Sequence, residues 1–347
     1  MSEIKLTKSQ VNKAGILLTK ETTPEEKRDN ALQIVSAWRR AHNYPLQVFT
    51  TTLEKYAKEI SPEAITVQRL KRIPSIIKKL QRTYPGQKGT IKLTRMQDIA
   101  GCRSILPTLK DVQLLQQKYE KSRLRHKKIK ENNYLLEPKE DGYRSLHLIY
   151  AFQSEKNKQE YNDKLIEIQI RTQLQHLWAT AVETTGFFIG QALKLSEGEE
   201  DWKEFFQLVS IAFARKEETP ELKQNKKLYQ LIREKEKKLF AITKMKKWNE
   251  SIRLFEEMSS KKEKEYFVLE LDTIQEKTTI SSFTKQEEEK AIELYAKIEK
   301  KIYGRKEYDV VLVGAKNITT LKEAYLNYFA DTKEFIKEIK KIVDEKN

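Results

Sequence analysis

Residues 165–178 read LIEIQIRTQLQHLW, and this stretch decides the fold of the first half of the chain. Up to Arg171 isoleucines occupy every second position, with Glu167, Gln169 and Arg171 between them. A period of two with β-branched residues on one side predicts a half-buried strand. Its polar side carries a carboxylate, an amide and a guanidinium in a row, which is compatible with a solvated face and with a functional one.

The composition indicates a folded protein with a polyanionic partner. The chain has 347 residues, 67 Lys and Arg against 51 Asp and Glu, a formal net charge of +16, and 38% hydrophobic residues. A basic surplus favours nucleotides or nucleic acid as partners, although a lysine-rich solvated surface would give the same balance. The single cysteine, Cys102, excludes an internal disulfide and a multi-cysteine zinc site. No stretch approaches the roughly 18 apolar residues of a membrane span and no signal-peptide run opens the chain, so we expect a cytoplasmic protein with no membrane partner.

The hydrophobic periodicities predict an α+β protein. Composition and pattern change along the chain at about residues 60, 200 and 264. The predicted parts are an N-terminal helical scaffold, a mixed-sheet domain flanked by helices, a Lys- and Glu-rich connector of exposed helices, and a small β-β-α-β-α domain, over residues 1–60, 61–200, 201–264 and 265–347.

Within these parts the pattern predicts individual elements. Scaffold helices are expected at about 24–41 and 49–60. The mixed-sheet domain should have strands at 65–71, 98–106, 143–151 and 165–171, helices at 74–84, 109–121 and 174–193, and a cationic loop at 122–128. The last part should have strands at 266–272, 278–283 and 308–315 and helices at 286–300 and 321–343, the last with a break near Ala330.

Charged residues on these elements form the set that phosphoryl-type transfer requires. Such transfer needs cations around a polyphosphate, carboxylates for a divalent metal and a group that positions the attacking hydroxyl. Arg69 and Lys71 share one strand face, and Lys79 lies on the next helix. Asp98 and Glu167 lie on two strands, as expected for ligands of Mg²⁺, which prefers oxygen and keeps water molecules. Each of these residues alone could equally be a solvated charge.

Four motifs around these residues carry a family resemblance. In chain order they read RLKRIPSIIKKL, QDIAGCRSIL, PKEDGYRSLHLIY and IEIQIRT. Their order and spacing resemble the synthetase domain of the RelA/SpoT superfamily, which includes the small alarmone synthetases. The resemblance covers roughly residues 60–190. It implies a nucleotidyltransferase-like pyrophosphokinase fold that transfers the β,γ-pyrophosphate of ATP to a ribose hydroxyl and releases AMP.

The resemblance also implies which residues bind ATP, the donor substrate. Arg69 and Arg103 match the residues that sandwich the adenine. Lys71 and Lys79 would bind the phosphates, and Ser75 matches the serine of the same motif.

Metal and acceptor residues are implied in the same way. Asp98 would hold Mg²⁺, and Glu167 would complete the metal site and help to deprotonate the acceptor hydroxyl. Tyr143 matches the residue on which the acceptor base stacks. His147 would share the strand face of Tyr143 and contact the acceptor or a phosphate. Alternatively, it is a hydrogen-bonded structural histidine. Because strict alternation would aim Asp98 and Arg103 at opposite faces, we expect Asp98 at the strand end or a bulge near the following glycine.

Two acceptors are compatible with the resemblance. GDP or GTP is the commonest in the superfamily, whereas a toxic branch modifies the 3′ end of tRNA and so blocks translation. NALQIVSAWRRAHNYPL (30–46) and TQLQHLWATAVETTG (172–186) resemble the toxic branch, and the loop 122–128 could bind an acceptor stem or be merely solvated. The leading hypothesis is a tRNA pyrophosphokinase toxin. The alternatives are a synthetase of (p)ppGpp or ppApp and an RNA-binding protein without catalysis.

The end of the chain suggests a regulator. YDVVLVGAKNITTLKEAYLNYFADTKEFIKEI (308–339) resembles the C-terminal, pseudo-zinc-finger antitoxin domain of CapRel-type fused toxin–antitoxins. In that family the domain covers the active site until a phage trigger protein, typically a major capsid protein, releases it, which is a form of antiviral defence. Tyr325 and Tyr328 match its Tyr-x-x-Tyr element and share a helix face. They would cover the nucleotide pocket, or else pack the core of the small domain.

Overall fold

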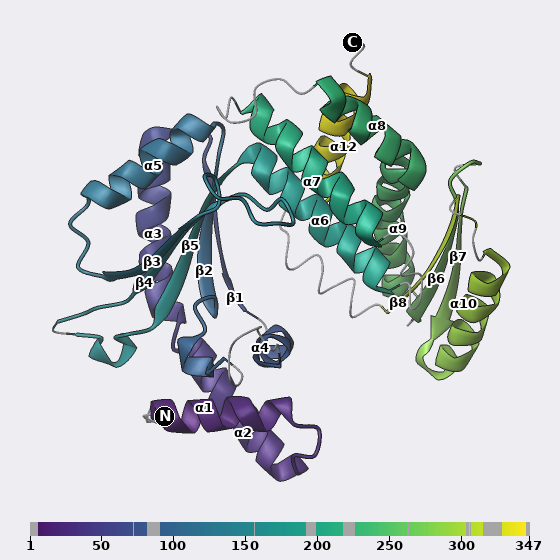
Figure 1. The fold of residues 1–347 in the computed structure, drawn as a ribbon. Helices are drawn as coiled ribbons and strands as arrows, with labels where there is room; N and C mark the ends of the chain where they lie inside the picture. Colours follow the sequence, from purple (N-terminus) through teal and green to yellow (C-terminus); the bar gives the residue numbers. More distant parts are fainter. Residues whose placement is uncertain are drawn as a thin grey trace. The chain divides into compact units, whose positions relative to one another are not determined.

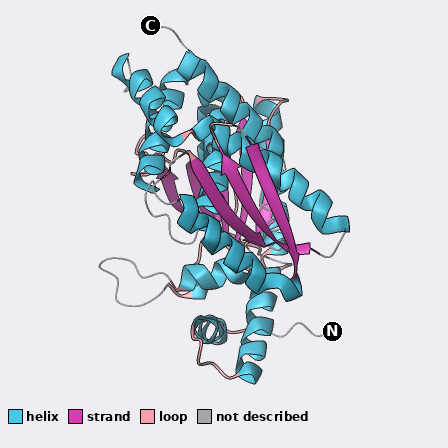
Figure 2. Cartoon of the chain, turned by 90° about the vertical axis from the view of Figure 1, so that its right-hand side faces the viewer, coloured by secondary structure: helices cyan, strands magenta, loops and turns pink. Residues whose placement is uncertain are grey.

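The structure is a computed structural model that describes residues 6–71, 73–81, 91–155, 157–191, 199–217, 226–261, 264–275, 277–302, 305, 307–314 and 328–344. The chain divides into two compact units: Met1–Glu137 with Ser145–Gln173, and Pro138–Arg144 with Leu174–Asn347. The chain is mostly helical, and its strands gather into sheets (Figure 2). The predicted α+β class is therefore confirmed. Among the described residues, no helix combines the length and the apolar character needed to cross a membrane.

Helices make up most of the start of the first unit. They are α1 (Lys8–Thr19), α2 (Glu25–Arg40), α3 (Asn43–Ile60) and, after the first strand, α4 (Ile73–Leu80) (Figure 1). The α1 helix, which the sequence pattern did not predict, begins with a capping box between Thr7 and Gln10. Leucine, valine and tryptophan side chains of α1, α2 and α4 form one buried cluster.

A five-stranded mixed sheet is the centre of the first unit. Its strands are β1 (Ile65–Leu70), β2 (Ala100–Leu106), β3 (Lys127–Asn133), β4 (Leu146–Ala151) and β5 (Leu165–Thr172), in the order β1-β2-β5-β4-β3. The central pair β2–β5 is parallel and the other pairs are antiparallel. Helix α5 (Leu109–Lys121) follows β2, and short 3-10 turns lie at Leu93–Arg95 and Gln159–Tyr161.

The alternation along β5 separates the two faces of the sheet. Ile166, Ile168 and Ile170 are each 0% exposed and pack with residues of α3 and α5. Glu167 and Gln169 project from the opposite face, because successive side chains of a strand alternate. The prediction of a half-buried strand at 165–171 is confirmed.

Several local predictions for this unit need correction. Residues 127–133, expected to start within a cationic loop, form strand β3 at the edge of the sheet. Tyr143 lies before β4, which begins only at Leu146, so Tyr143 and His147 do not share a strand face. The alternative for Asp98 is settled: it lies in a turn before β2, and the β1–β2 and β2–β5 ladders run without a register shift.

The second unit combines a helical layer with a small sheet. Its helices are α6 (Gln173–Gln191), α7 (Glu199–Lys216), α8 (Lys226–Leu239), α9 (Ala241–Lys261) and α12 (Tyr328–Asp344). Strands β6 (Lys264–Asp272), β7 (Lys277–Thr284) and β8 (Tyr308–Gly314) form an antiparallel sheet in the order β7-β6-β8. Helix α10 (Glu288–Ile302), preceded by a 3-10 turn at Lys285–Glu287, packs against this sheet.

Two predictions for the second unit are wrong. The Lys- and Glu-rich helices α8 and α9 are not merely exposed, since Leu228, Ile232 and Trp248 are buried in the large core of the unit. Helix α12 starts at Tyr328 and continues through Ala330 without the break predicted there, and its Phe335 lies in that same core. The part of the predicted helix before residue 328 lies outside the described residues. Tertiary packing therefore overrides the weak local pattern. The three predicted domain boundaries remain predictions.

Candidate active site

Three polar residues of different strands meet on the open face of the five-stranded sheet. Arg103 of β2 and His147 of β4 are both Cα partners of Gln169 on β5. Residues paired across neighbouring strands project to the same face. Arg103 Nε donates a hydrogen bond to Gln169 Oε1 over 2.9 Å. The central amide is thereby fixed from one side.

Glu167 receives hydrogen bonds from both neighbours in this row. His147 Nδ1 lies 3.0 Å from Glu167 Oε1, and Gln169 Nε2 donates to Oε2 over 2.8 Å. A carboxylate can only accept, so the proton of the imidazole in this contact belongs on Nδ1. Each oxygen of Glu167 therefore has one donor.

Gly101 on β2 leaves room for Glu167 on the neighbouring strand β5. The two residues are Cα partners in the parallel β2–β5 pair. A Cβ atom at position 101 would lie 3.1 Å from the carbonyl oxygen of Glu167 and 3.9 Å from its Oε2. A side chain here would crowd the carboxylate, which explains why glycine suits this position without a bulge.

The environment keeps Glu167 ionised. Burial alone would raise the pKa of Glu167, but its hydrogen bond and electrostatic interaction with His147, with help from Gln169, hold the pKa below its ordinary value. The charge of Asp98 acts in the opposite direction and raises the pKa of Glu167. The two carboxylates are therefore close enough to interact, as expected for two members of one site.

Asp98 is held between two lysines. Lys71 Nζ lies 3.0 Å from Oδ2 and Lys79 Nζ lies 2.8 Å from Oδ1, and the three side chains are only 17%, 24% and 20% exposed for Lys71, Lys79 and Asp98. Burial would raise the pKa of Asp98, but the charge of Lys71 and the hydrogen bond and charge of Lys79 hold it below its usual range. This turn combines an ionised carboxylate with two cations that can reach phosphate oxygens.

The backbone explains why Lys71 reaches this place. Lys71 N donates to the carbonyl oxygen of Ile99 over 2.7 Å, which continues the β1–β2 ladder one step beyond the strands. Arg39 Nε of α2 donates to the carbonyl oxygen of Lys71 over 2.7 Å. Sequence reasoning missed Arg39, and its only signal is an arginine in the last turn of a helix.

A second residue that sequence reasoning missed is Tyr134. Its ring packs edge-on against the ring of His147, with centroids 5.3 Å apart. Tyr134 follows the edge strand β3, where the pattern predicted no strand, so nothing in the sequence placed it near His147.

Other predicted residues lie apart from these contacts. Arg69 is on β1, in register with Gly101, and its side chain is exposed. Ser75 is exposed on α4. Both side chains are therefore open to a ligand.

Tyr143 belongs to the second unit. Its ring lies 6.4 Å from that of Trp178 on α6, and Lys139 Nζ lies 4.9 Å above it. Gly142, which precedes it, has a φ of 89°, a backbone conformation that glycine adopts without strain. Tyr325 lies outside the described residues, and Tyr328 is the first residue of α12.

The described carboxylates are compatible with Mg²⁺. Among the residues that the structure describes, no group of three or more His, Cys, Asp or Glu side chains could hold a metal ion. Mg²⁺ does not need one, because it commonly binds through one or two carboxylates together with water and substrate phosphates. Two ionised carboxylates that repel each other, Asp98 and Glu167, are a donor set of that kind.

Comparison with known proteins shows what the region that contains this face is similar to. A family model described as "Region found in RelA / SpoT proteins" matches residues 68–186. GTP pyrophosphokinase YjbM of Bacillus subtilis (strain 168) is 33% identical over 132 residues, which cover 37% of this chain and 59% of that protein. GTP pyrophosphokinase YwaC of the same organism is 37% identical over 127 residues, covering 35% of this chain and 56% of that protein. The match thus spans less than two thirds of either relative.

A solved structure is also similar. The crystal structure of small alarmone synthetase 1 from Bacillus subtilis bound to its product pppGpp has a TM-score of 0.44 and 26% sequence identity to this chain. The similarity covers 53% of this chain and 94% of that one. The family model covers the region that contains Lys71, Asp98 and Glu167.

Proposed function

We propose that this chain is an ATP-dependent pyrophosphokinase that modifies the 3′ end of tRNA. The observation that carries the catalytic part is the pair Asp98 and Glu167, two ionised carboxylates within electrostatic reach of each other, with two lysines at the first. Metal-dependent phosphoryl transfer uses this combination of cations and carboxylates. The RelA/SpoT region around it supports the same reaction.

In the proposed reaction a ribose hydroxyl oxygen of the acceptor attacks the β-phosphorus of ATP. The new bond joins that oxygen to the β-phosphorus, the bond from the β-phosphorus to the oxygen bridging the α-phosphate breaks, and AMP leaves. Glu167 accepts the hydroxyl proton, which its ionised state allows. Mg²⁺, held by Asp98 and Glu167, would supply charge stabilisation to the phosphates.

Donor binding is assigned to the cations of the first unit. Lys71 and Lys79 would exchange their contacts with Asp98 for contacts with the ATP phosphates. Arg69, which is exposed, and Arg103, which is half-buried, would stack on the adenine. Ser75 is exposed on the same helix as Lys79 and would add a hydroxyl contact to the phosphates.

The choice of acceptor rests on charge and on resemblance. The net charge of +16 favours a polyanion larger than a nucleotide, and the segments 30–46 and 172–186 resemble the tRNA-modifying branch. Tyr143 would stack on the acceptor base and His147 would contact the acceptor or its phosphate. A nucleotide acceptor, giving (p)ppGpp or ppApp, is the second candidate, because both curated relatives are named GTP pyrophosphokinases.

Regulation by the C-terminal region is part of the proposal. Residues 265–347 would act as an antitoxin that a phage protein such as a major capsid protein releases, with Tyr325 and Tyr328 covering the site. The support is the resemblance of residues 308–339 to CapRel-type antitoxin domains. Because Phe335 and Ile339 of α12 are 0% exposed in the core shared with α8 and α9, deletion of the whole region would unfold that core. Point variants are the better test.

Transfer of label from γ-³²P-ATP decides among the candidates. The full chain is incubated with deacylated tRNA, with GDP or with ATP alone, and Asp98→Asn is the inactive control. Label on tRNA supports the leading proposal, and label on GDP alone would replace it by nucleotide synthesis. If the full chain is inactive, Tyr325→Ala with Tyr328→Ala should activate transfer; no transfer from either protein would refute the enzyme proposal.

A further inference from the structure

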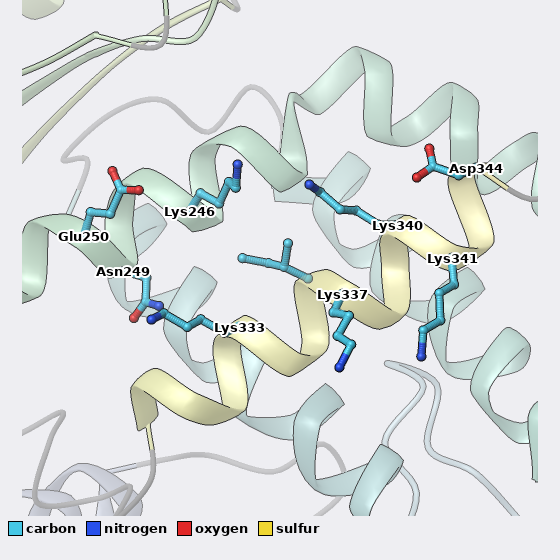
Figure 3. Close-up of a pocket in the computed structure, with 9 residues that line it drawn as sticks. Lys246, Asn249, Glu250, Lys333, Lys337, Lys340, Lys341 and Asp344 are labelled. Carbon is cyan, nitrogen blue, oxygen red and sulfur yellow. The ribbon is translucent and has the colours of Figure 1, made fainter.

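A basic groove lies between helices α9 and α12 of the second unit (Figure 3). It has a volume of about 680 Å³ and includes none of the residues assigned to the reaction above. Five lysines line it against two carboxylates. The lysines are Lys246, Lys333, Lys337, Lys340 and Lys341.

The sequence of α12 builds most of this groove. Lys333, Lys337 and Lys340 follow one another at spacings of four and three residues, which places them on one side of a helix. The other side carries Phe335 and Ile339, both 0% exposed in the core. Burial of that side fixes the lysines outward, and they extend over about 10 Å at about 1.5 Å per residue.

Three of the lysines have their charge available for a partner. Lys337 pairs with Glu334 at 3.3 Å and Lys341 pairs with Glu338 at 2.7 Å, each within α12. In the described parts of the chain, Lys246, Lys333 and Lys340 form no ion pair and are exposed.

The view of the groove shows where two of these ammonium groups lie. Lys246 extends from α9 and Lys340 extends from α12 into the space between the two helices (Figure 3). Two helices that are separate in the sequence, α9 and α12, therefore each place a cation in the groove.

Asn249 adds a polar group to the lining. It is 4% exposed, and its Oδ1 has no hydrogen-bond partner among the described residues. Buried acceptors are normally satisfied. The groove thus contains an acceptor that a donor from a ligand, such as a hydroxyl, could satisfy.

The residues that line the groove indicate which class of partner it could bind. Protein interfaces are depleted in lysine and depend on aromatic anchors, and small-molecule pockets are lined mostly by apolar and aromatic side chains. This groove has five lysines, no aromatic residue and a single apolar one, Ile336. Lysine point charges without a stacking surface fit a phosphate backbone rather than bases.

We infer that the α9/α12 groove binds the phosphodiester backbone of RNA without reading its bases. Asn249 could accept a hydrogen bond from a 2′-hydroxyl, the group that distinguishes RNA from DNA. The inference rests on the proposed function only in taking tRNA as the RNA. Binding at the groove requires neither ATP nor transfer.

The test compares two variants that each lose three positive charges. The groove variant is Lys246→Gln with Lys333→Gln and Lys340→Gln. Its control is Lys285→Gln with Lys290→Gln and Lys297→Gln, which are exposed positions at and on α10 of the same unit. Binding of deacylated tRNA to the full chain is measured without ATP over a range of NaCl concentrations, and thermal unfolding verifies that both variants remain folded.

Groove substitution should weaken tRNA binding by about 10- to 100-fold near physiological salt and flatten the slope of log K against log salt by about 2–3, since each phosphate contact contributes about 0.7–0.9. The control should bind within about twofold of the parent chain, because its lysines lie outside the groove. Equal losses in the two variants, or none in the groove variant, would overturn the inference.

Two further probes distinguish other ligands. A DNA duplex that binds as tightly as an RNA duplex of the same sequence would overturn the assignment to RNA. The second probe is inorganic tripolyphosphate. If the groove variant loses binding of tripolyphosphate but still binds tRNA, the groove is a site for small polyphosphates and not for RNA. Transfer assays on the same proteins distinguish failure of the proposed function from failure of this inference. Transfer can be absent while groove-dependent tRNA binding persists, and transfer can persist while groove-dependent binding is absent.

Discussion

His147 Nδ1 lies 3.0 Å from Glu167 Oε1, although His147 is paired in register with Gln169. The contact is therefore a diagonal one across the antiparallel β4–β5 pair, within the reach of long side chains. It places an imidazole donor on the carboxylate that is proposed to accept the acceptor proton. The alternative of a merely structural histidine makes a different prediction for pH dependence.

Replacement of His147 by Asn should shift the pH dependence of transfer. Without the imidazole, burial is offset only by the hydrogen bond from Gln169, and the pKa of Glu167 rises. The acidic limb of the pH–activity profile should therefore move to higher pH, and kcat at neutral pH should fall by about 100-fold, the low end of general acid–base effects. The profile of kcat against pH measures both. His126→Asn is the matched control, because His126 contacts Phe152 and the backbone of Gln153. An unmoved profile in the His147 variant would leave only the structural role.

Gly101→Ala should disturb Glu167 directly. The new Cβ would lie 3.1 Å from the carbonyl oxygen of Glu167, so the two central strands must separate slightly. We expect a loss of about 1–2 kcal/mol in the free energy of unfolding, as for other overpacked sites, with reduced transfer. Gly186→Ala on α6 is the control, because a Cβ there meets nothing within 4 Å; it should stabilise by about 0.5–1 kcal/mol through helix propensity. Denaturant unfolding of both variants provides the comparison, and equal stabilities would contradict the crowding.

Buried His42 should make stability fall in mild acid. Burial lowers the pKa of His42 from 6.5 to about 4, and its Nδ1 donates to the carbonyl oxygen of Trp38 over 2.8 Å. The lowered pKa means that the stabilising contribution is complete above pH 6.5, where both states are neutral. It is lost as pH falls from 6.5 to about 4, where only the unfolded chain takes up the proton.

The corresponding loss is about 3 kcal/mol, from about 1.4 kcal/mol per pKa unit. Unfolding free energies at pH 7 and pH 4.5 measure it. In His42→Asn the part of the slope that comes from this residue should disappear, while the carboxylate contributions at lower pH remain. A variant with the parent slope would show that another group titrates in this window.

Tyr143→Phe and Tyr143→Ala should behave differently in transfer. Phenylalanine keeps the aromatic face, whereas alanine removes a stacking energy of about 1–3 kcal/mol, or about 5- to 150-fold in kcat/KM. Melting curves are needed beside the transfer assay because the ring also packs 6.4 Å from that of Trp178. Full transfer by a folded Tyr143→Ala protein would remove the stacking role.

The sequence predicted the parts of the fold where local pattern and tertiary packing agree. The alternation of Ile166, Ile168 and Ile170 identified β5, and helix α5 lies at the predicted residues 109–121. The conflict between alternation and a shared site predicted either that Asp98 lies at the strand end or that a bulge intervenes near Gly101. The structure places Asp98 in the turn just before β2, with no register shift in the strand.

Other parts depend on contacts that no local pattern records. Strand β3 reads KKIKENN and has no apolar alternation, because an edge strand is partly solvated and pairs with a neighbouring strand, here β4, on one side only. The burial of Trp248 and Phe335 depends on helices far apart in the chain. Lys71 and Lys79 were both predicted as phosphate ligands, but their shared partner Asp98 was not, since that contact depends on the turn before β2.

The two cores are completed at different times while the chain is being synthesised. Strand β5, which carries Glu167, is complete at Thr172, whereas α12, which brings Phe335 into the helical core, ends at Asp344. The difference, 344 − 172 = 172 residues, corresponds to about 9–34 s at about 5–20 residues per second. Every charged side chain of the proposed catalytic face is thus made well before the ribosome has supplied the helix that completes the second core.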